Sequence, residues 1–278
     1  MSNFLTLPQI DETTEFIRQR ISIQPRVGMI LGSGLGGLAA SIENPVILPY
    51  AAIPNWPIST VVGHIGQLVI GHLENQPVLV MQGRVHFYEG YTITQVGLPV
   101  RVMQRLGIEI LLVTNAAGAV NPAYAPGDLM MITDHINLPG MAGLNPLYGP
   151  NLDELGPRFP DMSQAYDRQL CAQARLIAQE VGIALHEGIY IFLAGPSFET
   201  PADLRFLRAI GVDAVGMSTV PEVTVARHGG MRVLGISGIS NKANLDGNTI
   251  TSHEEVLEAG NVIVPKLSAL VRGVLRKL

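Results

Sequence analysis

The fold class of this chain is decided by the stretch Val27-Gly28-Met29-Ile30-Leu31-Gly32-Ser33-Gly34-Leu35-Gly36-Gly37. Its first five residues are apolar enough for one buried strand, and the glycines at 32, 34 and 37 let the backbone turn sharply and approach a ligand. Residues 38–43 can then open a helix. A strand, a glycine turn and a helix N-terminus together direct backbone N–H groups toward an anion. The stretch therefore predicts an α/β fold with an anion at the turn, or a tight turn that holds no ligand.

The composition describes a well-buried globular protein. Hydrophobic residues make up 47% of the 278 residues and charged residues 15%, which excludes a disordered chain. No repeat, low-complexity tract or linker interrupts the sequence, so we expect one domain over residues 1–278. The net charge of −5 argues against a protein that coats nucleic acid.

Targeting signals and cysteine usage favour a cytoplasmic protein without a membrane partner. The N-terminus lacks the basic segment and long apolar core of a signal peptide. The longest apolar runs fall far short of the roughly 20 residues that cross a membrane. The single cysteine, Cys171, cannot form an intrachain disulfide and suits a reducing compartment, and its position favours a core residue.

Strand and helix patterns alternate along the chain, which is typical of an α/β fold. Four prolines predict loop and short extended structure over residues 44–63, and residues 139–160 are expected to form one long loop. Strands are expected at 27–31, 67–72, 77–81, 108–113, 128–133, 188–193, 213–215 and 232–236. Helices are expected at 11–22, 96–107, 163–181 and near 221–229, after a cap at Thr200, and after a capping box at 252–255.

The glycine turn also matches the dinucleotide-binding pattern G-x-G-x-x-G, but the residues that follow argue against that interpretation. A dinucleotide site needs an Asp or Glu about 20 residues beyond the glycines to hold the ribose hydroxyls. Residues 44–73 contain neither. Instead Arg84 and His86 follow the strand at 77–81, and residues two apart on an extended segment point the same way. An arginine beside a histidine suits a phosphate, and a surface arginine with a core histidine is the alternative.

Polar residues follow three more of the expected strands, where an α/β sheet places its ligands. These residues lie at 114–118, 216–219 and 237–242. The turn at 195–200 adds Phe198, which can stack on a heterocycle, and Glu199, which can accept its N–H; the same turn could be a helix cap with a packed phenylalanine. Together these segments predict a pocket for phosphate, a hydroxylated group and a planar base.

Metal and covalent chemistry are not indicated by the sequence. The seven histidines include no His-x-x-x-His pair, and one cysteine cannot form a cysteine cluster of the kind that binds zinc. The Gly-x-Ser-x-Gly pattern of a nucleophile elbow follows none of the expected strands. We therefore expect no metal at the pocket.

Taken in order, the polar segments resemble those of the trimeric purine nucleoside phosphorylases. The resemblance runs from about Pro25 to the C-terminal helix. It is carried by the segments 32–36, 83–90, 114–118, 195–200, 216–223 and 240–242, and by the longer stretch 158–167. It implies a homotrimer whose subunit is a single α/β domain with a mixed, twisted central sheet surrounded by helices.

The resemblance also implies a reaction in which a purine nucleoside and inorganic phosphate give the free base and ribose 1-phosphate. Phosphate is then a co-substrate, and no cofactor is implied. By similarity, the catalytic residues are His86, Glu199 and Asn241. Phosphate would be bound by Ser33, His64, Arg84, His86, the Ala116 backbone and Ser218. The nucleoside would be bound by Tyr88, Phe159 of a neighbouring subunit, Phe198, Glu199, Met217, Asn241 and His253.

These residue types suit the chemistry of glycosidic bond cleavage. Cleavage leaves cationic character on the ribose and negative charge on the purine, so phosphate stabilises the first and a hydrogen bond from Asn241 to N7 stabilises the second. A carboxylate at Glu199 can accept N1–H, which together with the amide favours 6-oxopurines such as those of inosine and guanosine. Departures from the family pattern are small and include Val85, Ala119 and Ser240. The length of segment 243–251 decides whether His253 reaches the sugar.

Three other activities are weighed against this one. A phosphorylase of 5′-methylthioadenosine would carry an Asp at the base edge and no partner for a 5′-hydroxyl, which Asn241 and His253 disfavour. The missing acidic residue after the glycines disfavours a nicotinamide-dependent oxidoreductase. A non-catalytic binding protein with the same fold would leave the polar strand ends without a use.

Overall fold

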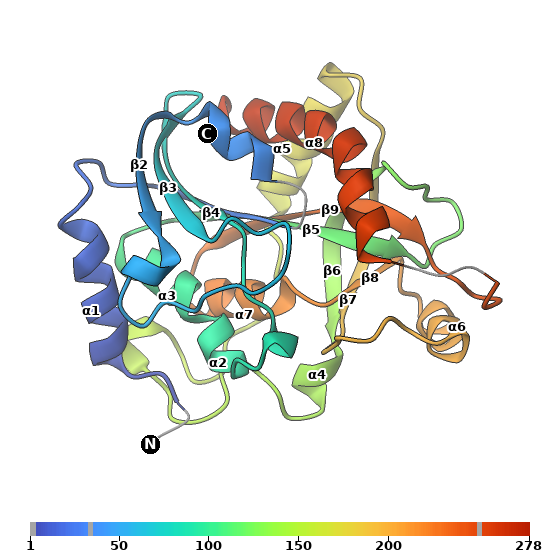
Figure 1. The fold of residues 1–278 in the computed structure, drawn as a ribbon, viewed down its shortest axis with the longest axis horizontal. Coiled ribbons are helices and arrows are strands. Elements are labelled where there is room, and N and C mark those ends of the chain that lie inside the picture. The colour runs from blue at the N-terminus through green and yellow to red at the C-terminus, as the bar shows by residue number, and fades with distance from the viewer. Residues whose placement is uncertain (1–3, 33–35, 249–251) are drawn as a thin grey trace.

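A nine-stranded sheet organises the computed structural model of the chain (Figure 1). The structure describes residues 4–32, 36–248 and 252–278, without the side chain of His253. The strands are β1 (Val27–Leu31), β2 (Glu43–Pro49), β3 (Gln67–Leu73), β4 (Gln76–Gln82), β5 (Ile110–Ala119), β6 (Leu129–Asn137), β7 (Leu185–Phe192), β8 (Ala214–Gly216) and β9 (Arg232–Lys242). The helices are α1 (Leu7–Arg18), α2 (Ile93–Val96), α3 (Leu98–Arg105), α4 (Leu138–Met141), α5 (Arg168–Glu180), α6 (Pro201–Ala209), α7 (Val220–His228) and α8 (His253–Leu275).

Five of the strands close into a ring. The sheet order is β2-β3-β4-β1-β5-β8-β7-β6-β9, and β9 pairs in addition with β5. Around the ring, β5–β8 and β6–β9 are antiparallel pairs, and the other three pairs are parallel. Strand β1 runs parallel to both β4 and β5. The predicted α/β fold with a mixed central sheet is confirmed, and the ring closure is a feature that no sequence pattern indicated.

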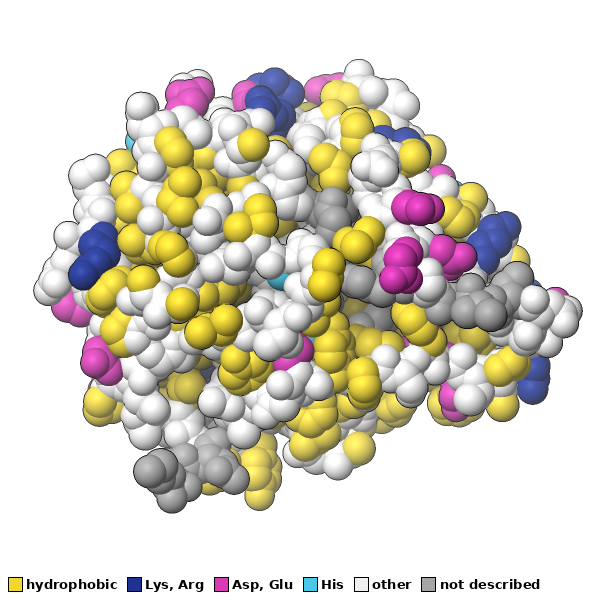
Figure 2. Space-filling view, viewed as in Figure 1, with side chains coloured by type: hydrophobic (Ala, Val, Ile, Leu, Met, Phe, Trp, Pro, Cys, Tyr) yellow, Lys and Arg dark blue, Asp and Glu magenta, His cyan; other side chains and the backbone are white. Residues whose placement is uncertain are grey.

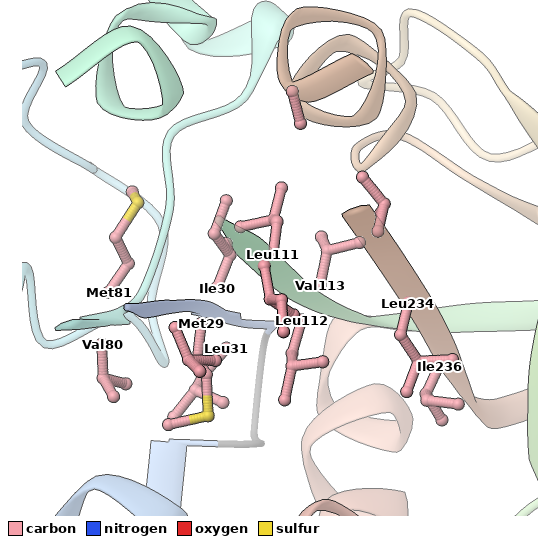
Figure 3. Close-up of a cluster of buried hydrophobic side chains, with 14 of the residues drawn as sticks. Met29, Ile30, Leu31, Val80, Met81, Leu111, Leu112, Val113, Leu234 and Ile236 are labelled. Atoms are coloured by element: carbon pink, nitrogen blue, oxygen red, sulfur yellow. The ribbon is translucent and has the colours of Figure 1, made fainter. Parts of the chain in front are cut away.

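Both faces of the sheet are covered near its centre, which explains why β1 is apolar throughout. All five residues of β1 are buried. Figure 3 shows Ile30 on the same side of the sheet as Leu111, with Met29 and Leu31 on the opposite side. Helices α1, α3 and α7 pack together on one side of the sheet, and α5 packs against α8 on the other (Figure 1). The opening stretch therefore does form a buried strand.

Part of the segment predicted as loop and short extended structure is a strand. The edge strand β2 lies largely within residues 44–63 and pairs antiparallel with β3. Pro45 and Pro49 lack an N–H group, which is tolerated because β3 is the one strand partner of β2 in the described chain. The helix predicted to open at residues 38–43 is a 3₁₀ helix at Gly36–Ser41, which ends because β2 begins at Glu43.

Two strands run through the segments that were predicted to follow them. Strand β5 continues to Ala119, and β9 continues to Lys242. Their parallel pairing persists over this distance, with Asn115 beside Ser237 and Ala116 beside Gly238. The prediction failed because the pattern of apolar residues ends before the hydrogen-bonded ladder does. The polar segments therefore reach the candidate site from within strands.

Helix α5 begins later than the predicted start at residue 163. Asp167 is its N-cap and accepts hydrogen bonds from the N–H groups of Gln169 and Leu170. The same carboxylate pairs with Arg232 at 3.0 Å. Tyr166 is therefore buried outside the helix instead of lying on its apolar stripe.

Three further predictions differ in their bounds. Helix α1 lies four residues earlier than the helix predicted at 11–22, because Thr6 and Gln9 form a capping box. Strand β6 continues past the predicted end at 133 to Asn137, which caps the short helix α4 at the start of the segment predicted as a loop at 139–160.

The hairpin of β3 and β4 and the capped helix after Thr200 are confirmed. Helix α3 forms most of the helix predicted at 96–107, and the short helix α2 precedes it across Gly97. Within the described residues, no helix has the length and apolar character needed to cross a membrane.

Candidate active site

A cavity of about 420 Å³ opens where β5, β8 and β9 meet the segment that follows β4. This volume lies in the range of sites for small molecules. Of the residues predicted from the sequence, the cavity is lined by Arg84, His86, Tyr88, Ala116, Phe198, Glu199, Met217, Ser218 and Asn241. The structure therefore brings together most of the predicted site.

The side chain of Arg84 is a positive charge buried beneath this cavity. Arg84 is 2% exposed. Its Nη1 lies 3.3 Å from Oε1 of Glu222, and its Nη2 donates to the backbone carbonyls of Thr114 and Ile30. Within the described residues, its Nε has no hydrogen-bond partner. The guanidinium is thus held by Glu222 and two backbone carbonyls, and Arg84 is also one of the residues that line the cavity.

Two histidines stand next to Arg84. The backbone N–H of Arg84 donates to Nδ1 of His64 at 3.1 Å, so the neutral His64 ring carries its proton on Nε2. The rings of His64 and His86 lie 5.3 Å apart, and His86 stacks on Tyr88 at 4.8 Å. His64 is not among the residues that line the cavity, but it packs against one that is.

The carboxylate of Glu89 holds His86 in place. Its Oε1 lies 3.0 Å from Nδ1 of His86 and accepts the His86 backbone N–H at 2.7 Å, while its Oε2 accepts the backbone N–H of Thr60. Burial alone would raise the pKa of this carboxyl, but the hydrogen bonds from His86 and Thr60 outweigh it and lower the pKa to about 2. An ionised Glu89 therefore fixes a proton on His86 Nδ1 and ties segment 58–64 to the site.

A different set of side chains forms another part of the cavity wall. Phe198 is 46% exposed and leaves an aromatic face open, and burial raises the pKa of the Glu199 carboxyl. Ser240 Oγ donates to Asn241 Oδ1 at 2.8 Å, so the Asn241 amide is oriented by its neighbour. A Cβ at Gly118 would lie 3.4 Å from Asn241 Nδ2, which makes Gly118 the point where β5 approaches this amide closely.

Several residues of the site have roles that sequence patterns did not indicate. Thr219 is fully buried, and its hydroxyl accepts from Arg84 and Asn115, both at 2.9 Å. Glu222 lies in the first turn of α7 and pairs with Arg84 at 3.3 Å. Glu89 follows His86 by three residues, a spacing that could have suggested their contact. The partnership of Glu222 with Arg84 joins distant parts of the sequence and had no local signal.

Besides His64, three predicted residues are not placed in the cavity. Ser33 lies outside the described residues, and so does the side chain of His253, although Val256 in the same first turn of α8 lines the cavity. Phe159 is 87% exposed and does not line the cavity of its own chain. Among the residues that the structure describes, no group of three or more His, Cys, Asp or Glu side chains could hold a metal ion.

Known proteins resemble this chain over nearly its full length. Residues 26–276 match the model of the phosphorylase superfamily. The chain is 54% identical to purine nucleoside phosphorylase 1 of Bacillus subtilis (strain 168), over 96% of this chain and 97% of that protein. It is 50% identical to the purine nucleoside phosphorylase of Rattus norvegicus, over 98% of this chain and 95% of that protein.

Solved structures give the same result for the fold. The crystal structure of Schistosoma mansoni purine nucleoside phosphorylase with adenosine matches with a TM-score of 0.95 and 41% identity, covering 100% of this chain and 99% of that chain. The structure of the Schistosoma mansoni enzyme with inosine matches with a TM-score of 0.94 and 41% identity, covering 100% and 98%. The similarity therefore extends over the whole α/β domain.

The contacts of Glu89 lead to a testable expectation. Because the folded protein lowers its pKa from 4.5 to about 2, Glu89 contributes stability that is complete above pH 4.5 and is lost as the pH falls toward 2. Glu89→Gln should therefore lower the free energy of unfolding by about 1–2 kcal/mol at pH 7, and by less as the pH falls through this window. Urea denaturation at several pH values measures this difference.

Hydrogen exchange provides a local test of the same contact. The Thr60 amide, which donates to Glu89, should exchange faster in Glu89→Gln. Glu109→Gln is a matched control, because Glu109 forms an exposed ion pair with Arg26 and contacts neither Glu89 nor Thr60 in the described structure. It should change neither the free energy of unfolding nor the exchange of the Thr60 amide. Unchanged stability and unchanged Thr60 exchange in Glu89→Gln would contradict the role assigned to this carboxylate.

Proposed function

Because the chain belongs to the purine nucleoside phosphorylases of the phosphorylase superfamily, we propose that its cavity binds inorganic phosphate against Arg84 and a 6-oxopurine nucleoside against Glu199 and Asn241. The reaction converts the nucleoside and phosphate to the free purine base and ribose 1-phosphate. The observation that carries this assignment of residues is the buried Arg84 cation, which lines the cavity and whose Nε has no hydrogen-bond partner in the described part of the chain.

The phosphate end of the cavity is assigned by charge and by donors. Arg84 supplies the fixed positive charge, while His86, Ser218 and the backbone at Ala116 supply further contacts. His64 adds a ring whose Nε2 carries a proton. Ser33 belongs to this set by its place in the sequence. Donors and a cation around one anion are the arrangement that proteins use to bind phosphate.

The length of strand β5 between Asn115 and Gly118 sets the distance between the phosphate end and the base end of the cavity. Asn115 contacts Thr219, which in turn contacts Arg84, while Gly118 lies against Asn241. Three residues of extended strand span roughly 10 Å. That length accommodates a ribose between a phosphate and a purine. Met217 and Tyr88, which both lie close to Gly195, line the cavity and are the proposed contacts of the ribose, with His253 toward its 5′-hydroxyl.

The base end is assigned by hydrogen-bond direction. Ser240 donates to Asn241 Oδ1, and one amide N–H of Asn241 donates to the Lys242 carbonyl at 3.4 Å, which leaves the other amide N–H for purine N7. Phe198 offers a face for stacking, and Glu199 offers an acceptor for N1–H. We propose inosine and guanosine as the preferred substrates. The Schistosoma mansoni enzyme was crystallised with both inosine and adenosine, so the preference over adenosine needs direct measurement.

Bond changes follow from this placement. The bond between C1′ and N9 breaks, its electron pair leaves with the purine, and a phosphate oxygen forms the new bond to C1′. The phosphate anion stabilises the cationic ribose as it develops, and the Asn241 amide stabilises the negative charge on the purine. Holding phosphate and nucleoside together supplies the orientation that the reaction needs. We assign His86, Glu199 and Asn241 as the catalytic residues.

We also propose that three copies of the chain assemble and that Phe159 reaches the site of a neighbour. Exposed apolar side chains support this proposal: Met141 is 79% exposed and Phe159 87% in the segment after β6, while Phe206 is 54% exposed on α6. Figure 2 shows hydrophobic side chains spread over the middle of the viewed face, with Lys and Arg mostly near its rim. The buried thiol of Cys171 accords with a cytoplasmic location.

Phosphate dependence is the first test of the proposed function. Inosine should be converted to hypoxanthine when phosphate is present, with ribose 1-phosphate as the second product, because phosphate is the nucleophile. Chromatography of the products with and without phosphate measures this. Equal turnover in phosphate-free buffer, with free ribose as the product, would mean that the enzyme is a hydrolase.

A substitution at Asn241 tests the assignment of the base end. Asn241→Asp should raise the ratio of adenosine to inosine turnover by at least about tenfold, because a carboxylate accepts from a 6-amino group and repels O6. The ratio of kcat/KM for the two nucleosides measures it. Asn244→Asp, at another position on the cavity wall, is the control and should move the ratio much less. An unmoved ratio in Asn241→Asp would show that another residue reads the base.

The assembly can be tested by sedimentation. The mass should be near that of three chains of 29.8 kDa. Phe159→Ala should raise KM for inosine without changing this mass, because the ring is proposed to contact the substrate of a neighbouring subunit. A monomer, or a trimer in which Phe159→Ala leaves KM unchanged, would exclude that contribution.

A further inference from the structure

We propose that Thr219 is a positioning residue for phosphate, whose hydroxyl links the Arg84 guanidinium to Ser218 and makes the Ser218 hydroxyl donate into the cavity. This inference rests on the proposed function, since it takes Arg84 and Ser218 to be phosphate-binding residues. Thr219 does not line the cavity, so it would act through its two neighbours.

The backbone at Thr219 has an unusual conformation. Its φ and ψ are +75° and −53°, and the N–H of Val220 donates to the carbonyl of Ser218 at 2.8 Å. These values describe a γ-turn of the rare kind with positive φ, with Thr219 at its centre. A β-branched residue in this region is a clear outlier, and such strain is found mainly at functional sites. The turn places Ser218 at the cavity and Thr219 behind it.

The side chain of Thr219 is also unusual for its position. Thr219 is the N-cap residue of α7, where a threonine hydroxyl normally accepts from a backbone N–H of the first turn. Here the side chain makes no such bond. Its hydroxyl is fully buried and instead accepts from Nη1 of Arg84 and Nδ2 of Asn115, both at 2.9 Å.

The directions of these two hydrogen bonds determine where the hydroxyl protons of Thr219 and Ser218 point. A guanidinium can only donate, and so can an amide nitrogen, so both lone pairs of Thr219 Oγ1 are used. Its own proton must then point to the remaining neighbour, which is Ser218 Oγ at 3.2 Å. Ser218 Oγ accepts that proton, which leaves its own hydroxyl proton for another acceptor.

Ser218 is placed to donate that proton to an anion. Its backbone N–H donates to the buried phenol of Tyr190 at 3.4 Å, and the same phenol also interacts with the Ser218 side chain. Ser218 lines the cavity. An anionic phosphate oxygen is a stronger acceptor for this hydroxyl than the neutral phenol of Tyr190. The result is a line of donors running from the Arg84 cation through Thr219 and Ser218 to the phosphate, each bond polarising the next.

Steady-state kinetics with three variants test this inference. Thr219→Val has nearly the same shape but no hydroxyl, and it should raise KM for phosphate by about tenfold or more, with KM for inosine within about twofold of the parent. Thr219→Ser keeps the hydroxyl and should restore phosphate KM to within about threefold. If Thr219→Val does not fold, Thr219→Ala removes the same hydroxyl and serves in its place. Calorimetric titration of inorganic phosphate into each protein measures the affinity without turnover.

A double variant tests whether Thr219 acts through Ser218. Ser218→Ala and Thr219→Val should each weaken phosphate binding, and their combination should weaken it by clearly less than the product of the two effects. If the two substitutions weaken phosphate binding independently, Thr219 acts on Arg84 alone, and the proposed link from Thr219 to Ser218 is wrong. A Thr219→Ser variant as impaired as Thr219→Val would also overturn it, because packing would then matter and the hydroxyl would not.

The inference and the proposed function fail in different ways. If the parent protein neither binds phosphate nor needs it to cleave inosine, the proposed function is wrong. If the parent needs phosphate and Ser218→Ala weakens its binding, but Thr219→Val binds phosphate like the parent, only the role of Thr219 is wrong.

Discussion

A single buried charge, the guanidinium of Arg84, constrains the arrangement of this molecule. It sits at the end of β4, and its counter-charge Glu222 comes from α7, while carbonyl groups of β1 and β5 accept its remaining hydrogen bonds. An uncompensated charge in such a place costs several kcal/mol, and breaking a buried pair by removing one partner typically costs about 3–5 kcal/mol. Four elements that are far apart in the sequence must therefore meet at one point. The buried apolar strand β1 is the part of this arrangement that is visible from the sequence alone.

The ring of five strands holds the groups around Arg84 at a fixed distance from the rest of the candidate site. Because β5 and β9 are paired from Ile110 to Ala119, the Arg84 environment at Asn115 and the amide of Asn241 beside Gly118 keep a constant separation. Groups carried by paired strands are held more precisely than groups on loops, and electrostatic catalysis depends on such preorganisation. The parts that lie on turns, such as Phe198 and Glu199, surround this rigid frame.

Much of the fold and of the candidate site could be predicted because both leave local marks in the sequence. Apolar runs located β1, β3 and β4, and caps located α6 and α8. Polar residues at apolar strand ends located Arg84, Ser218 and Asn241. Local patterns failed where a long-range contact decides the structure. The prolines of β2 favoured loop and short extended structure because the sequence does not show that this strand lies at an edge. Nothing local to Glu222 pointed to Arg84, because the two residues are distant in the chain. The strained turn at Thr219 has no propensity signal, since a threonine there satisfies the usual preference for a helix cap.

The position of β2 at the edge has a consequence for how copies of this chain can associate. Every other strand in the described chain has partners on both sides, so β2 offers the one exposed row of backbone groups. Its Pro45 and Pro49 remove amide hydrogens from that row, and its pairing with β3 is irregular between Glu43 and Val46. Edges of this kind resist the addition of a further strand, which is the usual first step of amyloid-like aggregation. Self-association is thereby directed to side-chain surfaces, and a protein with so many exposed apolar residues can remain free of uncontrolled sheet growth at high concentration.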